Sequence, residues 1–329
     1  MRTRVFPFEG RIASEWDRFN ERSPTGTVFT SSNWLAVFRR PAGLTIRLLL
    51  AESDGQWLCG VPLAIRTKGP FRSAMPIGAS PYFGFVISPG LQTEPHQDLP
   101  NNPVALLASE ILTQVHYAEI PNVPGWRVDV PPRWEVEERK TYTRTLNDGI
   151  GHKPPEKDVR YELRKAERSK LRVEPSENPE VFVDLMRDAF RAKRLDAPVS
   201  ASAFLELYGE LRPGGRISVY LARRGEDVAA GAVILHDRRA HYYWLAATSS
   251  AFRSTGASYL LLQEIVKDLS RKGPRELDLV GANVPGVARF KAHFASQTAS
   301  YLVLKGYSST AARVTHRAYQ RLHRIRGFR

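Results

Sequence analysis

The chain has 329 residues, of which 42% are hydrophobic and 25% charged, and its formal net charge is +14. This balance is typical of a globular protein with one large or two ordinary domains. No apolar run reaches the 18 residues of a membrane-spanning helix, and the first residues lack the apolar core of a secretory signal, so we expect neither segment. The single cysteine, Cys59, excludes an internal disulfide and a cysteine-based metal cluster. We therefore expect a cytoplasmic protein that binds no metal.

The first half predicts alternating strands and helices. A strand over 3–8 and a helix over 12–22 precede a second helix over 31–40, which begins with Ser and Asn caps. Apolar strands over 44–53 and 56–66 are separated by Asp54-Gly55, a strong hairpin signal, and the second strand buries the Cys59 thiol. Residues 73–89 predict strand and loop, 102–119 a helix, and 125–132 and 135–146 two strands.

The second half predicts the same order of elements. A charged helix over 156–170 and a strand over 171–175 precede helices over 179–194 and 200–212. Three strands over 216–224, 227–237 and 239–248 form a meander that leads into a helix over 256–272. A strand over 276–281, a helix over 285–294, a strand over 300–306 and a basic helix over 311–329 complete the chain.

Two strand–turn–strand segments look duplicated. LAESDGQWLCGVPL, from Leu50, and LARRGEDVAAGAVI, from Leu221, align with one gap, and each has a glycine just past its middle. A glycine there often marks a bulge or the close approach of another backbone. Proline and charge between 147 and 156 mark a boundary. We expect a degenerate half-domain over 1–150, a catalytic half-domain over 151–310 and a separate helix over 311–329.

Positive charge is concentrated at the C-terminus. From Leu279 onward there are nine Lys and Arg residues and no Asp or Glu, which leaves +5 for everything before. Such a field attracts anionic partners, such as tRNA, nucleotide pyrophosphates or an anionic membrane face, the last as a peripheral contact without a transmembrane segment. The alternative is a general preference for arginine without a partner. DNA is not expected.

The order of elements over 171–306 resembles the GNAT acetyltransferase fold. In that fold the helix after the third meander strand has its N-terminus at the donor pyrophosphate, because unpaired N–H groups and the helix dipole favour anions. GNAT enzymes show Arg or Gln, two residues, Gly, one residue, and Gly or Ala at this turn. The resemblance implies a donor site at the turn made by Arg253, Ser254, Thr255, Gly256, Ala257 and Ser258. The alternative is a helix cap without a ligand.

The whole chain resembles the Fem-type branch of that superfamily, which contains two GNAT-like halves. The resembling segments are VFTSSNWLAVF, GVPLAIRTKGPFRSAMPIGASPYFGFVISPG, VRYELRKAERSKLRVE and LDLVGANVPGVARFKAHFAS. The resemblance implies an α/β protein of tandem GNAT-like half-domains with mixed central sheets. It also implies an acyl-CoA or aminoacyl-tRNA donor, with no permanently bound cofactor or covalent enzyme intermediate. Expected substrate-binding residues are Trp34, Arg39, Tyr82 and Phe290.

The Phe-Lys pair at 290–291 carries the main catalytic expectation. In characterised relatives the lysine of this motif lies in the active cleft and supports acyl transfer, so the resemblance assigns that role to Lys291. When an amine attacks an ester or thioester, negative charge develops on the carbonyl oxygen, and a fixed ammonium stabilises it. By spacing alone, Lys291 would be a lysine on a helix surface.

The attacking amine must also lose a proton. A carboxylate, a neutral histidine or a water chain can accept it, and Asp278, which ends the strand opposite the donor turn, is the candidate carboxylate. Tyr242 and Tyr243 lie on the strand before that turn, and strand alternation sends only one into the cleft; Tyr242 is our candidate. Either tyrosine can equally be structural. His293, two residues after Lys291, points elsewhere on a helix and is left out.

One departure from the bridge-forming relatives concerns the acceptor. Those enzymes place a basic residue just after the early Trp, where this chain has Val37, and some carry a coiled-coil insertion that is missing here. We therefore expect amide-bond formation on a small-molecule or peptide amine other than a cell-wall precursor. The rival interpretation is a non-catalytic protein that binds RNA or a membrane surface on a degenerate GNAT scaffold.

Overall fold

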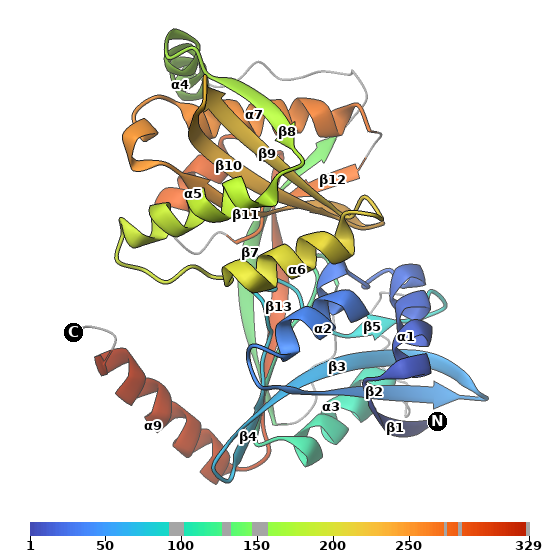
Figure 1. The fold of residues 1–329 in the computed structure, drawn as a ribbon. Coiled ribbons are helices and arrows are strands. Elements are labelled where there is room, and N and C mark those ends of the chain that lie inside the picture. The colour runs from blue at the N-terminus through green and yellow to red at the C-terminus, as the bar shows by residue number, and fades with distance from the viewer. Residues whose placement is uncertain (92–101, 127–132, 147–156, 273–274, 282–284, 327–329) are drawn as a thin grey trace. The chain divides into compact units, whose positions relative to one another are not determined.

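The computed structural model describes residues 1–91, 102–126, 133–146, 157–272, 275–281 and 285–326, with side chains as far as Arg321 (Figure 1). Contacts divide the chain into two compact units, Met1–Arg139 with Ser300–Arg329, and Lys140–Ala299. This grouping follows contacts, whereas the predicted boundaries at 150 and 310 follow chain order. The predicted linker, 147–156, and most of the predicted strand over 125–132 lie outside the described residues.

The first unit is a sheet with helices. Its strands follow the order β1-β2-β3-β4-β6-β13, and β5 pairs with β3. The bounds are β1 (Arg2–Pro7), β2 (Thr45–Ser53), β3 (Gln56–Lys68), β4 (Phe71–Ala74), β5 (Val86–Ile87), β6 (Tyr117–Pro121) and β13 (Gln297–Tyr307). The helices are α1 (Gly10–Arg22), η1 (Val28–Thr30), α2 (Ser32–Arg39), α3 (Pro103–Gln114) and α9 (Thr310–Arg326).

The second unit is a sheet of order β7-β12-β11-β10-β9-β8, in which β11 and β12 are parallel. The strands are β7 (Trp134–Leu146), β8 (Arg172–Ser176), β9 (Ile217–Arg224), β10 (Asp227–His236), β11 (Ala240–Thr248) and β12 (Arg275–Asp278). The helices are α4 (Lys157–Arg168), α5 (Pro179–Arg191), α6 (Ala201–Leu211), η2 (Ser250–Phe252), α7 (Ala257–Ser270) and α8 (Pro285–Ala292).

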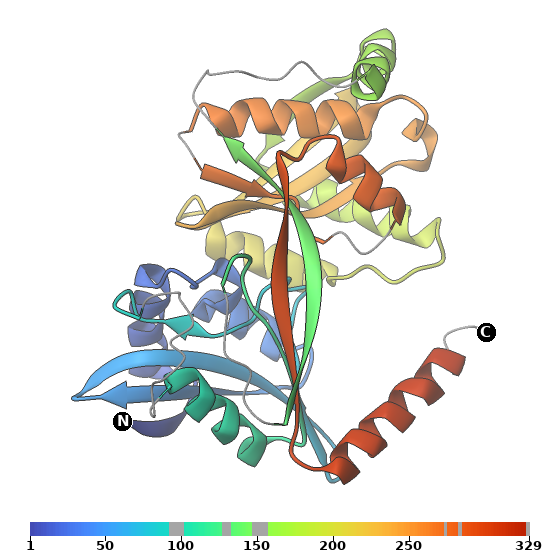
Figure 2. The same cartoon turned by 180° about the vertical axis from the view of Figure 1, so that it is seen from behind.

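Strands β7 and β13 are neighbours in the strand order and run side by side (Figure 2). The division between the units falls within β7, at Arg139, and within β13, at Ser300. The chain therefore passes from the first unit to the second along one strand and returns along the next.

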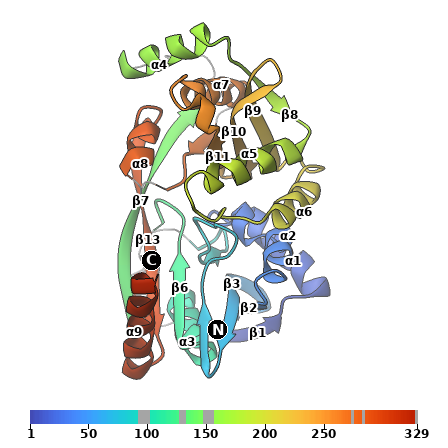
Figure 3. The same cartoon turned by 60° about the vertical axis from the view of Figure 1, so that its left-hand side comes forward.

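Helices cover both faces of the second unit's sheet (Figure 3). Along β10, Ala230, Ala232 and Ile234 belong to the buried cluster that also contains the apolar face of α7. A Cβ at Gly231 would point the other way, toward Phe182 of α5, as strand alternation requires. Strand β10 is buried on both faces. Its sequence is therefore a continuous apolar run rather than an alternation of apolar and polar residues.

The duplicated segments are two equivalent hairpins, one in each unit. Leu50 pairs with Gly60 in the first, and Leu221 pairs with Gly231 in the second. A Cβ at Gly60 would lie 2.6 Å from the Trp16 ring, and one at Gly231 would lie 3.0 Å from Phe182. Each glycine therefore lets a large aromatic side chain of the unit's own helix reach the sheet. The expected close approach is present in both hairpins, although a side chain makes it rather than a backbone.

The predicted helix over 102–119 is too long. Asn102 caps α3 through its side-chain oxygen, as its position before Pro103 favours, but the helix ends at Gln114. Tyr117–Pro121 is strand β6, whose antiparallel partner is β13. The apolar spacing alone could not show this change, because the partner strand lies far away in the sequence.

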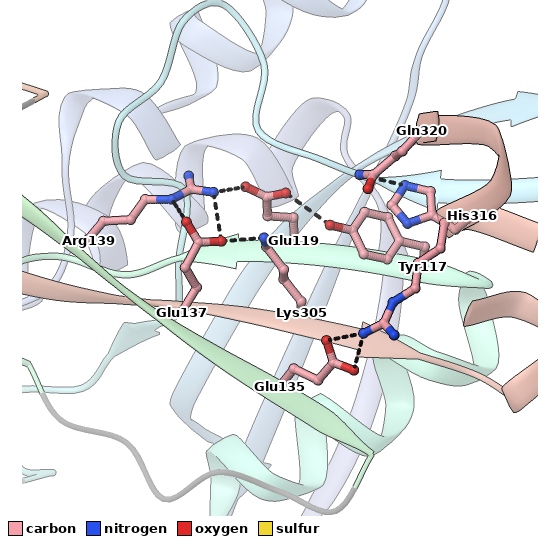
Figure 4. Close-up of polar contacts among 9 residues, drawn as sticks. Tyr117, Glu119, Glu135, Glu137, Arg139, Lys305, His316 and Gln320 are labelled. Atoms are coloured by element: carbon pink, nitrogen blue, oxygen red, sulfur yellow. Dashed lines mark hydrogen bonds and ion pairs between the residues drawn. The ribbon is translucent and has the colours of Figure 1, made fainter. Parts of the chain in front are cut away.

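The spacing of Val314, Ala318, Leu322 and Ile325 predicts that one apolar face of the terminal helix docks on the body of the protein, and this prediction is wrong. Val314 is 63% exposed and Ala318 is also exposed, whereas Ala312 and His316 are buried. The His316 ring stacks on Tyr117 of β6, with 3.8 Å between ring centroids (Figure 4). The interacting face is thus built on a histidine, which an apolar pattern does not count. The side chains of Leu322 and Ile325 lie outside the described residues.

The same spacing, one position earlier, predicts that Arg313, Arg317, Arg321 and Arg324 form a basic stripe in solvent, but the stripe is not uniformly solvated. Arg313 and Arg317 both contact the carboxylate of Glu135 on β7, at 3.2 and 3.1 Å. Arg321 is exposed, and the side chain of Arg324 is not among those described. No helix in the described part of the chain is long and apolar enough to cross a membrane.

Candidate active site

The parallel strands β11 and β12 diverge after a short paired segment. Its register covers three residue pairs in the described chain, the last of them Tyr242 with Asp278. Beyond this point the backbone amide of Leu279 donates to the carbonyl of Tyr142 on β7, on the other side of β12. Strand β11 continues to Thr248, so its later residues extend past the end of β12. Backbone groups at such a divergence are available to an extended ligand.

Lys291 lies at this divergence. Its ammonium donates to the carbonyl oxygens of Val280, in a short contact, and of Gly281, at 3.2 Å. The side chain belongs to α8 and is buried, with the residue 9% exposed. Burial lowers the pKa of Lys291 to about 8, and the nearby Asp278 carboxylate opposes that shift. A buried ammonium fixed by two carbonyls has one N–H donor beyond those contacts.

Asp278 is fixed on the same turn. Its Oδ1 atom accepts hydrogen bonds from the Thr141 hydroxyl at 2.7 Å and from the Val280 amide at 2.8 Å. The residue is 2% exposed. Asp278 thus holds the amide of Val280 while Lys291 holds the carbonyl of the same residue. Thr141, on β7, was not among the sequence candidates, and no local signal distinguishes it from other strand threonines.

The turn that the two charged residues hold is strained. Val280 has φ +47° and Gly281 has φ +70°. A β-branched residue rarely adopts the left-handed region, and such a conformation persists only where surrounding contacts impose it. The contacts from Asp278 and Lys291 supply that constraint. The turn directs two carbonyl oxygens at one ammonium and so fixes the position of its charge.

The two tyrosines of β11 are both buried. Tyr243 belongs to the apolar cluster around α7. Tyr242, our sequence candidate, is fully buried beside Asp278 in the strand register, and burial raises its pKa well above the ordinary value. Its hydroxyl also interacts with Asp237. Tyr242 therefore stays protonated at neutral pH.

The donor turn expected before α7 is partly covered by α4. Gly256 is the N-cap residue of α7, with φ +77°, and a Cβ on it would overlap the backbone oxygen of Glu162. Gly256 and Ala257 are buried, whereas Arg253 and Ser254 are exposed and Thr255 is half-buried. The glycine is therefore required by helix packing, and the turn is open on its Arg253–Ser254 side.

The last small residue of that turn is held by the preceding strand. The hydroxyl of Ser258 lies 2.8 Å from the hydroxyl of Thr248, the final residue of β11. The N-cap residue of α7 is Gly256, which has no side chain with which to cap the helix. Amides in the first turn of a helix have no partners within the helix, so an uncapped N-terminus attracts an anion.

Phe290 joins the α7 turn to α8. Its ring meets Tyr259, in the first turn of α7, edge-on with 5.0 Å between centroids. Phe290 is half-buried, and it precedes Lys291 by one residue. The aromatic pair thus fixes α8 against the start of α7. It couples the position of the expected donor turn to that of the ammonium.

The candidates in the first unit lie in an aromatic core. Trp34 is fully buried, and its indole N–H donates to the Ser80 hydroxyl at 2.9 Å. Phe29 makes edge contacts with Trp34 and with Tyr82, at centroid distances of 4.9 and 6.3 Å. Arg39 is half-buried at the end of α2. Trp34 and Tyr82 are brought together, but as packed side chains rather than as an open surface.

Residues 156–292 match the family model described as an acetyltransferase (GNAT) domain. This range contains the diverging strands, the α7 turn, Phe290 and Lys291. A search of curated protein sequences finds no significant match.

Solved structures share the fold over nearly the whole chain. A crystal structure of FemX is 15% identical, with a TM-score of 0.66, and the match covers 92% of this chain and 97% of that one. The C-terminal domain of a putative lysylphosphatidylglycerol synthetase from Agrobacterium fabrum is 13% identical, with a TM-score of 0.60 and coverage of 93% and 95%. A tandem GNAT protein from the clavulanic acid biosynthesis pathway is 12% identical, with a TM-score of 0.54 and coverage of 94% and 99%. These likenesses show that the chain shares the fold of these structures over nearly its whole length.

Proposed function

Since residues 156–292 form a GNAT acetyltransferase domain and the chain has the fold of the Fem-like branch, we propose that this protein forms amide bonds by transferring an acyl group to an amine. The observation that carries the proposal is the buried ammonium of Lys291, fixed at the point where β11 and β12 part. In a buried site, such a preorganised charge stabilises developing negative charge more strongly than it could in water.

The proposed reaction needs no covalent enzyme intermediate. The amine nitrogen attacks the carbonyl carbon of a thioester or ester, a C–N bond forms, and the C–S or C–O bond breaks. The third N–H of Lys291 donates to the carbonyl oxygen as it becomes an oxyanion. The nitrogen loses its proton to a water chain or to the Asp278 carboxylate, and the leaving thiol or hydroxyl takes up one proton.

We favour an acyl thioester of CoA as the donor. The uncapped start of α7 is open beside the exposed Arg253, and helix N-termini bind phosphates. An acyl-pantetheine arm extending from that turn would reach the diverging edges of β11 and β12. The tandem GNAT neighbour, whose structure is described as lacking AcCoA, is consistent with this donor.

Aminoacyl-tRNA is the second candidate donor. It is favoured by the nine positive and no negative residues after residue 278. The two ion pairs of Glu135 with Arg313 and Arg317 reduce that advantage, because part of the helical charge is neutralised within the protein. The acceptor class is a small-molecule or peptide amine.

Thermal unfolding with added ligands separates the donors. A ligand that binds only the native state, added at a concentration of 100 times its Kd, stabilises that state by about 2.7 kcal/mol. We expect acetyl-CoA to raise the Tm and acetyl-pantetheine, which lacks the pyrophosphate, to raise it less. A Tm shift with aminoacyl-tRNA and none with acetyl-CoA would identify aminoacyl-tRNA as the donor in place of the CoA thioester. If neither ligand binds, the non-catalytic alternative is favoured.

Turnover of Lys291→Ala tests the catalytic assignment. We expect kcat for acetyl transfer to a panel of primary amines to fall by about 10²–10³-fold, the loss typical of one oxyanion donor. Lys291→Arg should recover little, because a guanidinium is larger and planar. Lys267→Ala is the matched control, since that lysine is exposed on α7 and pairs with Glu264. Equal turnover in wild type and Lys291→Ala would refute the assignment.

A further inference from the structure

A pocket lies in the second unit, at the C-terminal end of α7, whereas the donor turn lies at the N-terminus of that helix. Its volume is about 480 Å³, within the usual range for small-molecule sites. Residues of β8, β9, α6, the end of β10, the start of β11, the end of α7 and the start of β12 line it. Asp268 lies twelve residues after Gly256, which at 1.5 Å per residue places the pocket roughly 18 Å from the donor turn along the helix.

Two histidines and a serine form a hydrogen-bonded chain in this pocket. The Ser218 hydroxyl lies 2.9 Å from Nε2 of His236, and Nδ1 of His236 lies 2.7 Å from Nδ1 of His241. His241 is 4% exposed, and its Nε2 atom has no hydrogen-bond partner among the residues that the structure describes. A buried polar atom without a partner is unfavourable, so a ligand that supplies the partner is stabilised by that contact.

The two histidines of this hydrogen-bonded series are uncharged at neutral pH. Burial lowers the pKa of His236 to about 3 and that of His241 to about 4. Histidines this weakly basic are poor general bases, so the Ser218 hydroxyl is not an activated nucleophile. A neutral pair can still shift its protons between the two tautomers, and Nε2 of His241 then donates or accepts. The histidine pair is thus suited to hydrogen bonding with a ligand rather than to general-base catalysis.

Charged groups surround the histidines in a nearly balanced set. Lys272 pairs with Asp268 at 2.9 Å, and Asp268 also accepts a hydrogen bond from Tyr220 at 2.6 Å. Arg212 forms a two-pronged ion pair with Glu177. Arg275 donates to the backbone oxygen of Asp237 at 3.0 Å, so its contact is to a neutral group. After these pairings one positive charge is left over.

The helix ends restrict the ligand further. Asp268 lies in the last turn of α7, and Tyr208 lies in the last turn of α6. Helix C-termini carry partial negative charge and repel anions. A single carboxylate beside Arg275 is compatible with that field, whereas a phosphate dianion is disfavoured.

We propose that this pocket binds a small organic monocarboxylate that also carries a hydroxyl, carbonyl or amine group. The carboxylate pairs with the Arg275 guanidinium, and a small turn of the buried His241 ring brings its Nε2 atom within hydrogen-bonding distance of the second polar group. The site is separate from the transfer site, because Arg275 begins β12 and the turn held by Lys291 follows its end. The pocket is therefore a second ligand site, and its occupant is recognised without taking part in the acyl transfer at Lys291.

Histidine ring signals test the proposal directly. The full chain, labelled with ¹⁵N-histidine, is titrated with L-lactate, L-serine and pyruvate, and separately with inorganic phosphate. We expect at least one carboxylate to shift the ring nitrogens of His236 and His241 with saturation, and phosphate to shift them weakly or not at all. Arg275→Gln should weaken that carboxylate at least tenfold.

Two controls separate this site from other effects. Arg271→Gln removes an exposed arginine that caps the same end of α7 but does not line the pocket, and it should leave the affinity unchanged. Lys291→Ala should also leave it unchanged, so failure of the transfer proposal would not affect this one. No saturable shift with any carboxylate, equal binding of phosphate, or an unchanged affinity in a folded Arg275→Gln protein would overturn the proposal.

Discussion

The charge of Lys291 depends on three neighbours. Burial lowers its pKa to about 8, while the Val280 and Gly281 carbonyls and the Asp278 carboxylate favour its charged form. The amino-acid motif identifies this lysine, but the motif does not supply its environment. A residue that is half protonated near pH 8 is sensitive to small changes around it, which makes its titration measurable.

Transfer should therefore decline with increasing pH through about 8. The ammonium is the form that stabilises an oxyanion. Above that pH, kcat/KM should therefore fall as this single group loses its proton. Asp278→Asn retains an Oδ1 acceptor for Thr141 and Val280 but removes the charge that raises the lysine's pKa. We expect the alkaline decline to move to lower pH in this variant. A pH profile identical to wild type would show that another group sets the decline.

The same titration should appear in stability. The unfolded lysine titrates at its ordinary pKa, near 10.5, so between pH 8 and that value the unfolded state binds more protons. The free energy of unfolding should then rise with pH, relative to Lys291→Met, by at most about 3 kcal/mol across that window. Urea unfolding of both proteins at pH 8 and pH 10 measures the difference. A constant difference would mean that the lysine's pKa is not lowered by folding.

At the scale of elements, the start of α7 depends on one glycine. Gly256→Ala places a Cβ at φ +77° and against the Glu162 carbonyl of α4. Left-handed geometry costs about 1–2 kcal/mol for a residue with a Cβ, and the overlap with a backbone atom adds to it. Gly225→Ala is the control, because its φ is +58° with nothing within 4 Å. Chemical denaturation should show a clearly larger loss for Gly256→Ala; equal losses would mean that α4 yields freely.

The terminal helix is tied to β7 through Glu135. If α9 binds tRNA, Glu135→Gln should strengthen binding, because Arg313 and Arg317 are released from their ion pairs. Arg321→Gln should weaken it and reduce the salt slope by about 1, since that exposed arginine forms no ion pair within the described part of the chain. These partly exposed pairs contribute at most about 1 kcal/mol to stability, so the Tm should change little. Unaltered affinity in both variants would show that the helix does not contact tRNA.

At the scale of the whole molecule, the first unit needs the end of the chain. Strand β13 pairs with β6 over Val303–Tyr307, although nearly two hundred residues separate the two strands. A chain ending at residue 308 keeps that strand and loses only α9, so it should melt cooperatively, at a somewhat lower temperature because Tyr117 loses the stacked His316 ring. A chain ending at residue 296 leaves β6 without this partner, and the first unit should not fold. Circular dichroism melts of the two truncations compare them; equal melts would show that β13 is dispensable.

The sequence by itself determined which local elements form. The Asp54-Gly55 hairpin, the Asn102 cap and the duplicated glycines at 60 and 231 act over a few residues, and each is present where the pattern places it. The order of these elements, with the Phe-Lys motif, was enough to indicate a tandem GNAT-like fold.

Only the tertiary structure decided where distant groups meet. Strand β6 was hidden because its partner is β13, and the buried face of α9 was hidden because it is a histidine ring on Tyr117. The strained turn at Val280 is held by Thr141-bound Asp278 and by Lys291, contacts that join three elements. The pocket around His241 likewise joins strands and helices far apart in the chain. Local propensity is a property of neighbours in sequence, whereas register, burial and lowered pKa values arise only when folding removes distant side chains from water together.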